Sequence, residues 1–279
     1  MRWLIDWNLA FDPFHPPRRI YIPTPVHEEG VQRIAHAFAS GGFWGAMIAP
    51  SGYGKTAIVD EAIARIKGPK TSAVRVDGAI DGPSLYAQIA GSLGRRVPPG
   101  ASLAVAWRSL REARRIRGAM KMNVFIAVDN VHMICDPESL LRLAALESSP
   151  ASRTFILTCG RPQGDFEILT DNMYLLEIER SGTRIRPRRL SRDETDAYLN
   201  AKLAAAGAAE SRFSPRAVSR IHVHSKGIPR SIDRLAKRSL IVASEQGAEI
   251  VGPPLVDSIA LEFDTDFNYI NVEENAGLI

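Results

Sequence analysis

The sequence is poor in cysteine and in long apolar runs, and each shortage excludes a class of protein. Its two cysteines, Cys135 and Cys159, are too few for a disulfide framework and show no metal-binding spacing. Cys159 lies in an apolar, strand-like run and is expected to be a buried free thiol. No stretch of 18 or more uncharged apolar residues occurs, so no membrane-spanning helix is predicted. Asp6 interrupts what would be the apolar core of a signal peptide, so we expect a cytoplasmic protein.

Aromatic residues are also few, and no charge of one sign dominates the chain. Aromatic residues make up 7% of the sequence, hydrophobic residues 45% and charged residues 24%, which is typical of an ordinary globular protein. The net charge is +4 and the isoelectric point is near 9.2. This mild basicity is compatible with nucleic-acid binding but does not require it.

The first two thirds of the chain alternate between apolar stretches and amphipathic segments. Strands are predicted at 43–49, 72–76, 124–129, 154–158 and 174–178. Helices are predicted at 27–40, 55–67, 81–93, 103–117 and 137–147. Strands that alternate with helices predict an α/β fold, a three-layer αβα sandwich around a parallel sheet.

From Leu190 the pattern becomes purely helical. Ser191 and Glu194 form a capping box that opens a helix ending near Gly207, and Ser214-Pro215 opens the next. Two more helices are predicted at 230–246 and 254–263. We therefore expect an extended, proline-rich N-terminal arm (1–30), a mixed α/β domain (31–186), a small all-α lid domain (187–264) and an acidic tail (265–279). The boundary between the two domains is expected within 184–190.

A glycine-bearing loop after the first strand carries the main functional signal. Its glycines allow backbone N–H groups to converge on a phosphate chain, and the helix that follows presents its positive end there. Lys55 is expected to reach the β- and γ-phosphates, and the Thr56 hydroxyl to bind Mg²⁺. Ala49 replaces the first glycine of the usual motif. The predicted nucleotide-binding residues are Pro50, Ser51, Gly52, Tyr53, Gly54, Lys55, Thr56 and Ala57.

Two further strand ends supply candidate catalytic groups. Asp129 ends an apolar strand and is expected to hold the Mg²⁺ shell together with Thr56. Asn130 follows it, at a position where ATPases with such a phosphate loop usually carry a glutamate. An amide can hold a water molecule but cannot accept its proton. His132 is a conceivable substitute base or an ordinary histidine. Thr158 either faces the γ-phosphate or is a plain strand threonine.

Arg230 opens a lid helix, which runs against the dipole preference for acids at that position. A guanidinium group is suited to phosphate oxygens, so Arg230 is expected to couple the lid to the γ-phosphate.

These motifs together resemble the AAA+ ATPases of the ExeA/GspA type, which are close to the transposition helper ATPases of the TniB and TnsC kind. The similarity also includes 9–14, 190–195, Tyr198, 206–207, 213–214 and Gly227-Ile228-Pro229-Arg230. The resemblance implies Walker A, Walker B, sensor-1 and sensor-2 roles for Lys55/Thr56, Asp129, Thr158 and Arg230. It also implies assembly of a homo-oligomer on ATP binding, with an arginine supplied by the neighbouring subunit. Arg153 and Arg161 are candidates for that arginine or ordinary surface charges.

Two functions follow as hypotheses. The first is Mg²⁺-dependent ATP hydrolysis, slow or stimulated by a partner, that drives a nucleotide-controlled assembly; ATP, ADP and Mg²⁺ are then the ligands. The alternative is a switch or scaffold that binds ATP without hydrolysing it. The partner is either double-stranded DNA or another protein. Arg108, Arg111 and Arg115 share one face of a predicted helix, which is either a DNA-backbone contact or a solvated surface.

Overall fold

The computed structural model describes residues 1–17, 20–134, 137–146, 151–161 and 183–262. The chain divides into two compact units, of which one is Val26–Arg188 and the other combines Met1–Pro25 with Arg189–Ile279. No helix in the described ranges combines the length and the apolar character needed to cross a membrane. The predicted acidic tail lies outside these ranges.

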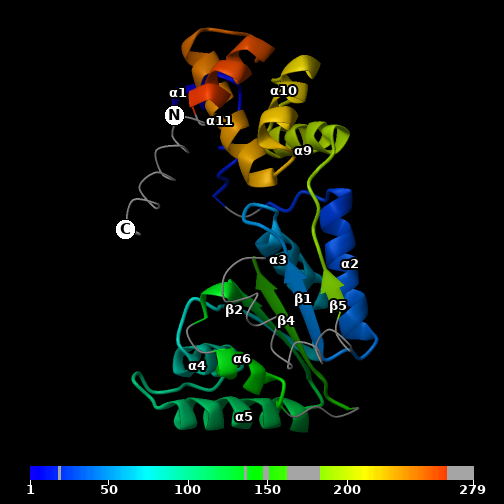
Figure 1. Cartoon of the computed structure of the whole chain (residues 1–279), viewed down its shortest axis with the longest axis vertical. Coiled ribbons are helices and arrows are strands. Elements are labelled where there is room, and N and C mark those ends of the chain that lie inside the picture. The colour runs from blue at the N-terminus through cyan, green and yellow to red at the C-terminus, as the bar shows by residue number, and fades with distance from the viewer. Residues whose placement is uncertain (18–19, 135–136, 147–150, 162–182, 263–279) are drawn as a thin grey trace, which may run out of the picture. The chain divides into compact units, whose positions relative to one another are not determined.

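The Val26–Arg188 unit is built on a five-stranded sheet in which every neighbouring pair is parallel (Figure 1). In sheet order its strands are β2 (Thr71–Asp77), β3 (Asn123–Asp129), β4 (Thr154–Gly160), β1 (Trp44–Ile48) and β5 (Thr183–Ile185). The predicted αβα sandwich is confirmed, and β1–β4 agree with the predicted strands to within a few residues. The strand predicted at 174–178 lies outside the described residues. β5 overlaps the start of the interdomain linker that was expected within 184–190.

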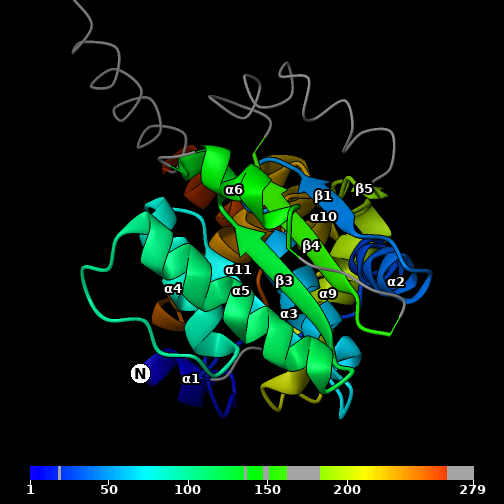
Figure 2. The same ribbon diagram turned by 90° about the horizontal axis from the view of Figure 1, so that it is seen from below.

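Helices cover both faces of this sheet (Figure 2). They are α2 (Pro25–Ala39), α3 (Lys55–Ile66), α4 (Gly82–Ser92), α5 (Leu103–Ala119), the 3₁₀ turn η1 (Val131–Met133) and α6 (Pro137–Leu143). Alternation along β3 sorts the two faces: Val124, Ile126 and Val128 join the core under α4 and α5. Phe125 points the other way, where its ring meets Phe38 of α2 edge-on at 5.8 Å.

The second unit is helical, as the sequence predicts. Its helices are α1 (Arg2–Asp6), α9 (Arg192–Ala205), α10 (Pro215–Ser225) and α11 (Pro229–Glu245), and residues 253–262 are also helical. The capping box is present: Glu194 N–H donates to Ser191 Oγ at 3.2 Å, and Ser191 N–H donates to Glu194 Oε2 at 2.7 Å. Pro215 occupies the start of α10 after its N-cap Ser214.

The N-terminal arm forms part of this helical unit. The indole N–H of Trp7 donates to the carbonyl of Leu240 in α11 at 2.8 Å. Asp12 forms an ion pair with Lys237 at 2.6 Å. The prediction of an extended arm is wrong for α1. Helical spacing places Trp3 and Trp7 on one side, where both are buried, and the first proline comes only at Pro13.

Candidate nucleotide-binding site

The loop between β1 and α3 has the backbone conformation expected of a phosphate cradle. Gly52 and Gly54 have φ of +85° and +82°, in the left-handed region that a side chain disfavours. Gly54 is the residue immediately before α3, so the N–H groups at the positive end of that helix open into the loop. Pro50, Ser51 and Tyr53 complete the loop, and Ala57 is the third residue of α3.

The side chain of His27 packs against the loop at Gly54. A Cβ added to Gly54 would overlap the imidazole ring of His27, which projects from the first turn of α2. His27 is buried, at 4% exposure. Glycine is therefore required at position 54 both by its backbone conformation and by the space that His27 leaves. Nothing in the local sequence around His27 signals this contact, because it depends on how α2 packs beside α3.

Lys55 reaches across the loop. Its Nζ donates to the carbonyl oxygens of Ala49 at 2.6 Å and Pro50 at 3.0 Å. The side chain is 8% exposed, so its ammonium group is held inside the concave face of the loop. Ala49, which replaces the usual glycine, is buried at 2% exposure and still supplies its carbonyl to Lys55. The substitution thus leaves the lysine in place.

Thr56 and Asp129 meet at the foot of the loop. The Thr56 hydroxyl donates to Asp129 Oδ2 at 2.8 Å, which joins the start of α3 to the end of β3. Asp129 is 4% exposed, and Arg75 Nη1 lies 3.5 Å from the same carboxylate oxygen. A hydroxyl and a carboxylate are hard oxygen ligands of the kind that Mg²⁺ binds in phosphate-loop sites. The donor set therefore fits Mg²⁺ beside a nucleotide.

Asn130 turns out of β3 in a constrained conformation. Its φ of 54° and ψ of 36° are left-handed values, uncommon for residues other than glycine and often found at functional sites. Its backbone N–H donates to Asp129 Oδ1 at 3.0 Å, and its side-chain Nδ2 donates to Asp77 Oδ1 at 3.2 Å. The amide nitrogen is thus directed toward Asp77, and the amide oxygen is directed away from it.

Asp77 was not identified from the sequence. Asp77 ends β2 and is paired in register with Asp129. The two parallel strands therefore place both carboxylates at the carboxyl-terminal end of the sheet. The next residue, Gly78, donates its N–H to the Asp129 carbonyl at 2.6 Å, and a Cβ at Gly78 would lie 2.8 Å from that oxygen. The acid at the end of a predicted strand was a usable signal, but the pairing of β2 with β3 was needed to interpret it.

His132 lies in η1, next to this edge. Both of its ring nitrogens are buried and have no hydrogen-bond partner among the described residues. Burial lowers the pKa of His132, and the positive charges of Arg161 and Lys55 lower it further. A histidine with a lowered pKa is neutral at pH 7, and the same surroundings make its imidazole a weaker proton acceptor than that of an exposed histidine.

The other predicted residues have more ordinary surroundings. The Thr158 hydroxyl is buried within the sheet and donates to the carbonyl of Gly45 at 3.3 Å. Arg153 precedes β4, and its guanidinium donates to the Ala39 carbonyl at 3.3 Å. Arg161 directly follows β4, so it lies at the same end of the parallel sheet as Asp129, and it is exposed. Cys159 is a buried free thiol, as predicted, and burial raises its pKa.

Arg230 belongs to the other unit. It is the second residue of α11 and is exposed. The structure therefore brings together Lys55, Thr56, Asp129 and Asn130 in one unit and adds Asp77 and His132 to them. The sensor-2 role of Arg230 stays a prediction.

The fold and this loop define the class: the chain has the architecture of a P-loop ATPase of the AAA+ kind. In the same fold, the ORC1 protein of Aeropyrum pernix, solved in complex with DNA, superimposes with a TM-score of 0.72 and 14% identity; the match covers 91% of this chain and 69% of that one. Cdc6p of Pyrobaculum aerophilum gives a TM-score of 0.70 and 18% identity, over 88% and 69% of the two chains.

A curated relative agrees with the resemblance expected from the sequence. General secretion pathway protein A of Aeromonas hydrophila is 23% identical over 234 residues, which is 83% of this chain and 42% of that protein. The chain thus spans less than half the length of this relative. No family model matches the chain. Its similarity to AAA+ ATPases of the ExeA type is confirmed.

Proposed function

We propose that this chain binds ATP with Mg²⁺ at the loop 49–56 and hydrolyses it slowly. The observation that carries this proposal is the Thr56–Asp129 hydrogen bond of 2.8 Å, which is made by the residue that follows the buried Lys55. A cation that neutralises phosphate oxygens and an oxygen pair suited to Mg²⁺ are both needed for phosphoryl transfer. Bound Mg²⁺ supplies positive charge to the phosphate oxygens, and Thr56 and Asp129 are the residues that would hold it.

The slow rate follows from Asn130. Because its amide nitrogen is committed to Asp77, its amide oxygen is the end available to accept a hydrogen bond from a water molecule. Such an oxygen orients water but does not remove its proton at working pH. Asp77, which accepts the hydrogen bond from this amide, is a carboxylate at the ends of these strands that can accept the proton.

In this proposal the bound nucleotide controls the assembly of the chain into an oligomer. ATP binding by this chain drives formation of a homo-oligomer that associates with double-stranded DNA in the cytoplasm. The similarity to the archaeal ORC1 protein, whose structure contains DNA, supports the DNA partner, as does the basic net charge. The roles of Thr158 and Arg230 as nucleotide sensors belong to the same proposal.

A second function is favoured by one specific observation, the absence of a glutamate at position 130. In this alternative the bound nucleotide acts only as a switch. A ligand at about 100 times its dissociation constant stabilises the bound state by about 2.7 kcal/mol, which is enough to change an assembly without chemistry.

Calorimetric titration with Mg·ATP, followed by measurement of phosphate release, tests both functions. The wild-type chain is expected to bind Mg·ATP and Lys55→Ala to lose this binding, while the exposed Lys67→Ala retains it as a matched control. Binding with slow phosphate release supports the ATPase, and binding with none supports the switch. No binding by the wild type would overturn the nucleotide site itself.

A further inference from the structure

Arg75 is a cationic residue close to the proposed Mg²⁺ ligands. It lies in β2 between Val74 and Val76, which are buried in the core under α4 and α5. Because successive side chains of a strand point to opposite faces of the sheet, Arg75 points to the other face. There its Nε lies 2.8 Å from Oδ1 of Asp60, a residue of α3.

The same guanidinium group also reaches the carboxylate of Asp129. Its Nη1 lies 3.5 Å from Asp129 Oδ2, the oxygen that accepts the hydrogen bond from Thr56. The pairing of β2 with β3 makes this contact possible, because Arg75 stands opposite Ala127, two residues before Asp129. One oxygen of Asp129 is therefore shared between a hydroxyl group and a cation.

Asp129 needs a positive partner because it is buried. A carboxylate removed from water is costly unless a cation or several hydrogen-bond donors stabilise its charge. Thr56 and the backbone N–H of Asn130 are neutral donors to it. Lys55 donates to two carbonyl oxygens of the loop. Arg75 is thus the cation that the described structure pairs with Asp129.

An ion pair that only tied β2 to α3 would not require the second contact. The contact with Asp60 makes that connection by itself. Nη1 lies instead near the oxygen that the proposed function assigns to Mg²⁺. A guanidinium group and a divalent cation repel each other at one carboxylate oxygen, so the two cannot share it without cost.

We infer that Arg75 competes with Mg²⁺ for Asp129 and thereby sets how strongly nucleotide binding depends on the metal. The inference rests on the proposed function and assigns a regulatory residue to that same site. When Asp129 Oδ2 holds the metal, Arg75 keeps Asp60 as its counter-ion.

The ratio of two affinities measures this competition. ATP binding is measured by calorimetry with saturating Mg²⁺ and again with a metal chelator, and the ratio of the two association constants reports the coupling between metal and nucleotide. Arg75→Gln is expected to raise this ratio by about fivefold, because Mg²⁺ no longer meets a positive charge at Asp129. The effect is modest because Arg75 is partly exposed and solvent screens its charge. Arg75→Lys retains the charge and is expected to keep a ratio close to that of the wild type.

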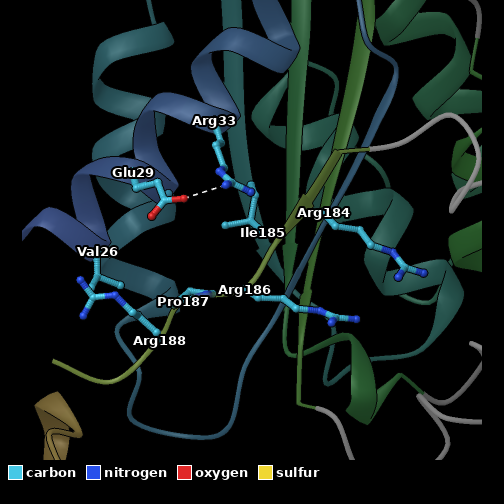
Figure 3. A pocket seen from close by; sticks show the side chains of 9 residues that line it. Val26, Glu29, Arg33, Arg184, Ile185, Arg186, Pro187 and Arg188 are labelled. Carbon is cyan, nitrogen blue, oxygen red and sulfur yellow. Dashed lines mark ion pairs between the residues drawn. The ribbon is translucent and has the colours of Figure 1, made fainter. Parts of the chain in front are cut away.

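Two further measurements separate competition from a structural role. A residue that merely positioned Asp129 would lower the ratio when lost, because the metal ligand would be misplaced. In the Asp129→Asn background, which lacks the carboxylate, Arg75→Gln is expected to leave the ratio unchanged. The matched control is Arg33→Gln, which removes an arginine from the exposed 2.7 Å ion pair with Glu29, at a groove between α2 and residues 184–188 (Figure 3). This control is expected to keep the wild-type ratio.

The outcomes distinguish this inference from the proposed function. An unchanged or lowered ratio in Arg75→Gln, with Mg·ATP still bound, would overturn the inference and leave the nucleotide site intact. An equal rise in Arg33→Gln, or a rise that persists in the Asp129→Asn background, would also contradict it, since overall charge would then explain the effect. A wild type that binds no Mg·ATP would instead overturn the nucleotide site, and the inference with it. Cooperative thermal unfolding shows that each variant is folded.

Discussion

At the scale of single residues, the nucleotide site differs from its expected form at one position that changes the chemistry. The left-handed backbone at Asn130 turns its side chain onto Asp77, so a side-chain hydrogen bond joins the end of β3 to the end of β2 beside Thr56 and Asp129, the proposed Mg²⁺ ligands. The carboxylate expected after Asp129, the proposed Walker B aspartate, is therefore replaced by an amide that donates to a carboxylate on the neighbouring strand. This arrangement can orient a water molecule but lacks a base in the usual place.

Asn130→Glu is expected to raise the rate of phosphate release by about 10²-fold or more, because general-base catalysis contributes that much in a prepared site. Mg·ATP affinity should change little, since Lys55, Thr56 and Asp129 are untouched. The measurement is steady-state phosphate release at saturating Mg·ATP, with affinity taken from calorimetry. Gln32→Glu, on the exposed surface of α2, makes the same amide-to-carboxylate change away from the site and serves as the control. An unchanged rate in Asn130→Glu would support the switch over the ATPase.

Gly54 gives a second prediction at this scale. Gly54→Ala is expected to weaken Mg·ATP binding by at least about tenfold, because the new methyl group displaces the loop from His27 in addition to about 1–2 kcal/mol of left-handed strain. Gly247→Ala is the matched control: its φ is +67°, and an added Cβ meets nothing within 4 Å. In thermal unfolding Gly247→Ala should lose stability from strain alone and Gly54→Ala from strain and the overlap with His27, and in calorimetry only Gly54→Ala should lose nucleotide affinity. Equal affinities would show that the His27 contact is not needed.

At the scale of elements, the long periodic segments were predictable and the short edge strand was not. Helix α11 and strand β3 carry clear periodicity or a continuous apolar run, so the sequence located them within a residue or two. β5 has three residues, of which only Ile185 is buried, and its neighbours are arginines and a proline. A pattern that short gives no periodicity, and pairing with β1 alone makes it a strand.

The site residues divide in the same way, into those that a local sequence motif identifies and those that only the packing of the elements identifies. Lys55 and Thr56 were predicted because a phosphate loop is a local motif, and Asp129 because an acid ends a strongly apolar strand. Asp77 and His27 depend on which strands and helices lie side by side, which one chain segment does not encode. Similarly, Arg114 lies in the same arginine-rich stretch of α5 as the exposed Arg108 and Arg111, yet it is 3% exposed, which only the packing of α5 decides.

Arg114 yields the prediction at the scale of elements, because it joins α5 to the segment that leads into β4. Its guanidinium donates to Thr154 Oγ1 and, at 2.6 Å, to the carbonyl of Ser152. Arg114→Ala removes both hydrogen bonds and the buried side chain that makes them, and is expected to lower the free energy of unfolding by about 2–4 kcal/mol. The exposed Arg108→Ala should change it by less than about 0.5 kcal/mol. Urea unfolding of the two variants makes the comparison, and equal midpoints would contradict it.

At the scale of the whole molecule, the two ends of the described chain are part of one helical unit, and the Val26–Arg188 unit lies between them in sequence. The arm is held there by Trp7, by Asp12 and by Phe14, whose ring lies 5.5 Å from the ammonium of Lys202. Lys202 also pairs with Asp233 at 2.7 Å. The segment 9–14 that carries part of the family resemblance is therefore a structural element of the helical unit.

Nucleotide-dependent assembly is the prediction that belongs to the whole molecule. Mg·ATP at about 100 times its dissociation constant is expected to stabilise the chain by about 2.7 kcal/mol and so to raise its melting temperature. Light scattering should then show a larger particle with Mg·ATP than without it, and Lys55→Ala should show neither effect.

A non-hydrolysable ATP analogue separates the two functions. If the analogue supports assembly and ATP assemblies later dissociate as phosphate is released, hydrolysis resets the particle. If the ATP and analogue assemblies persist equally, binding alone controls it, and Asn130 is suited to a switch. A particle of the same size with and without nucleotide would contradict both.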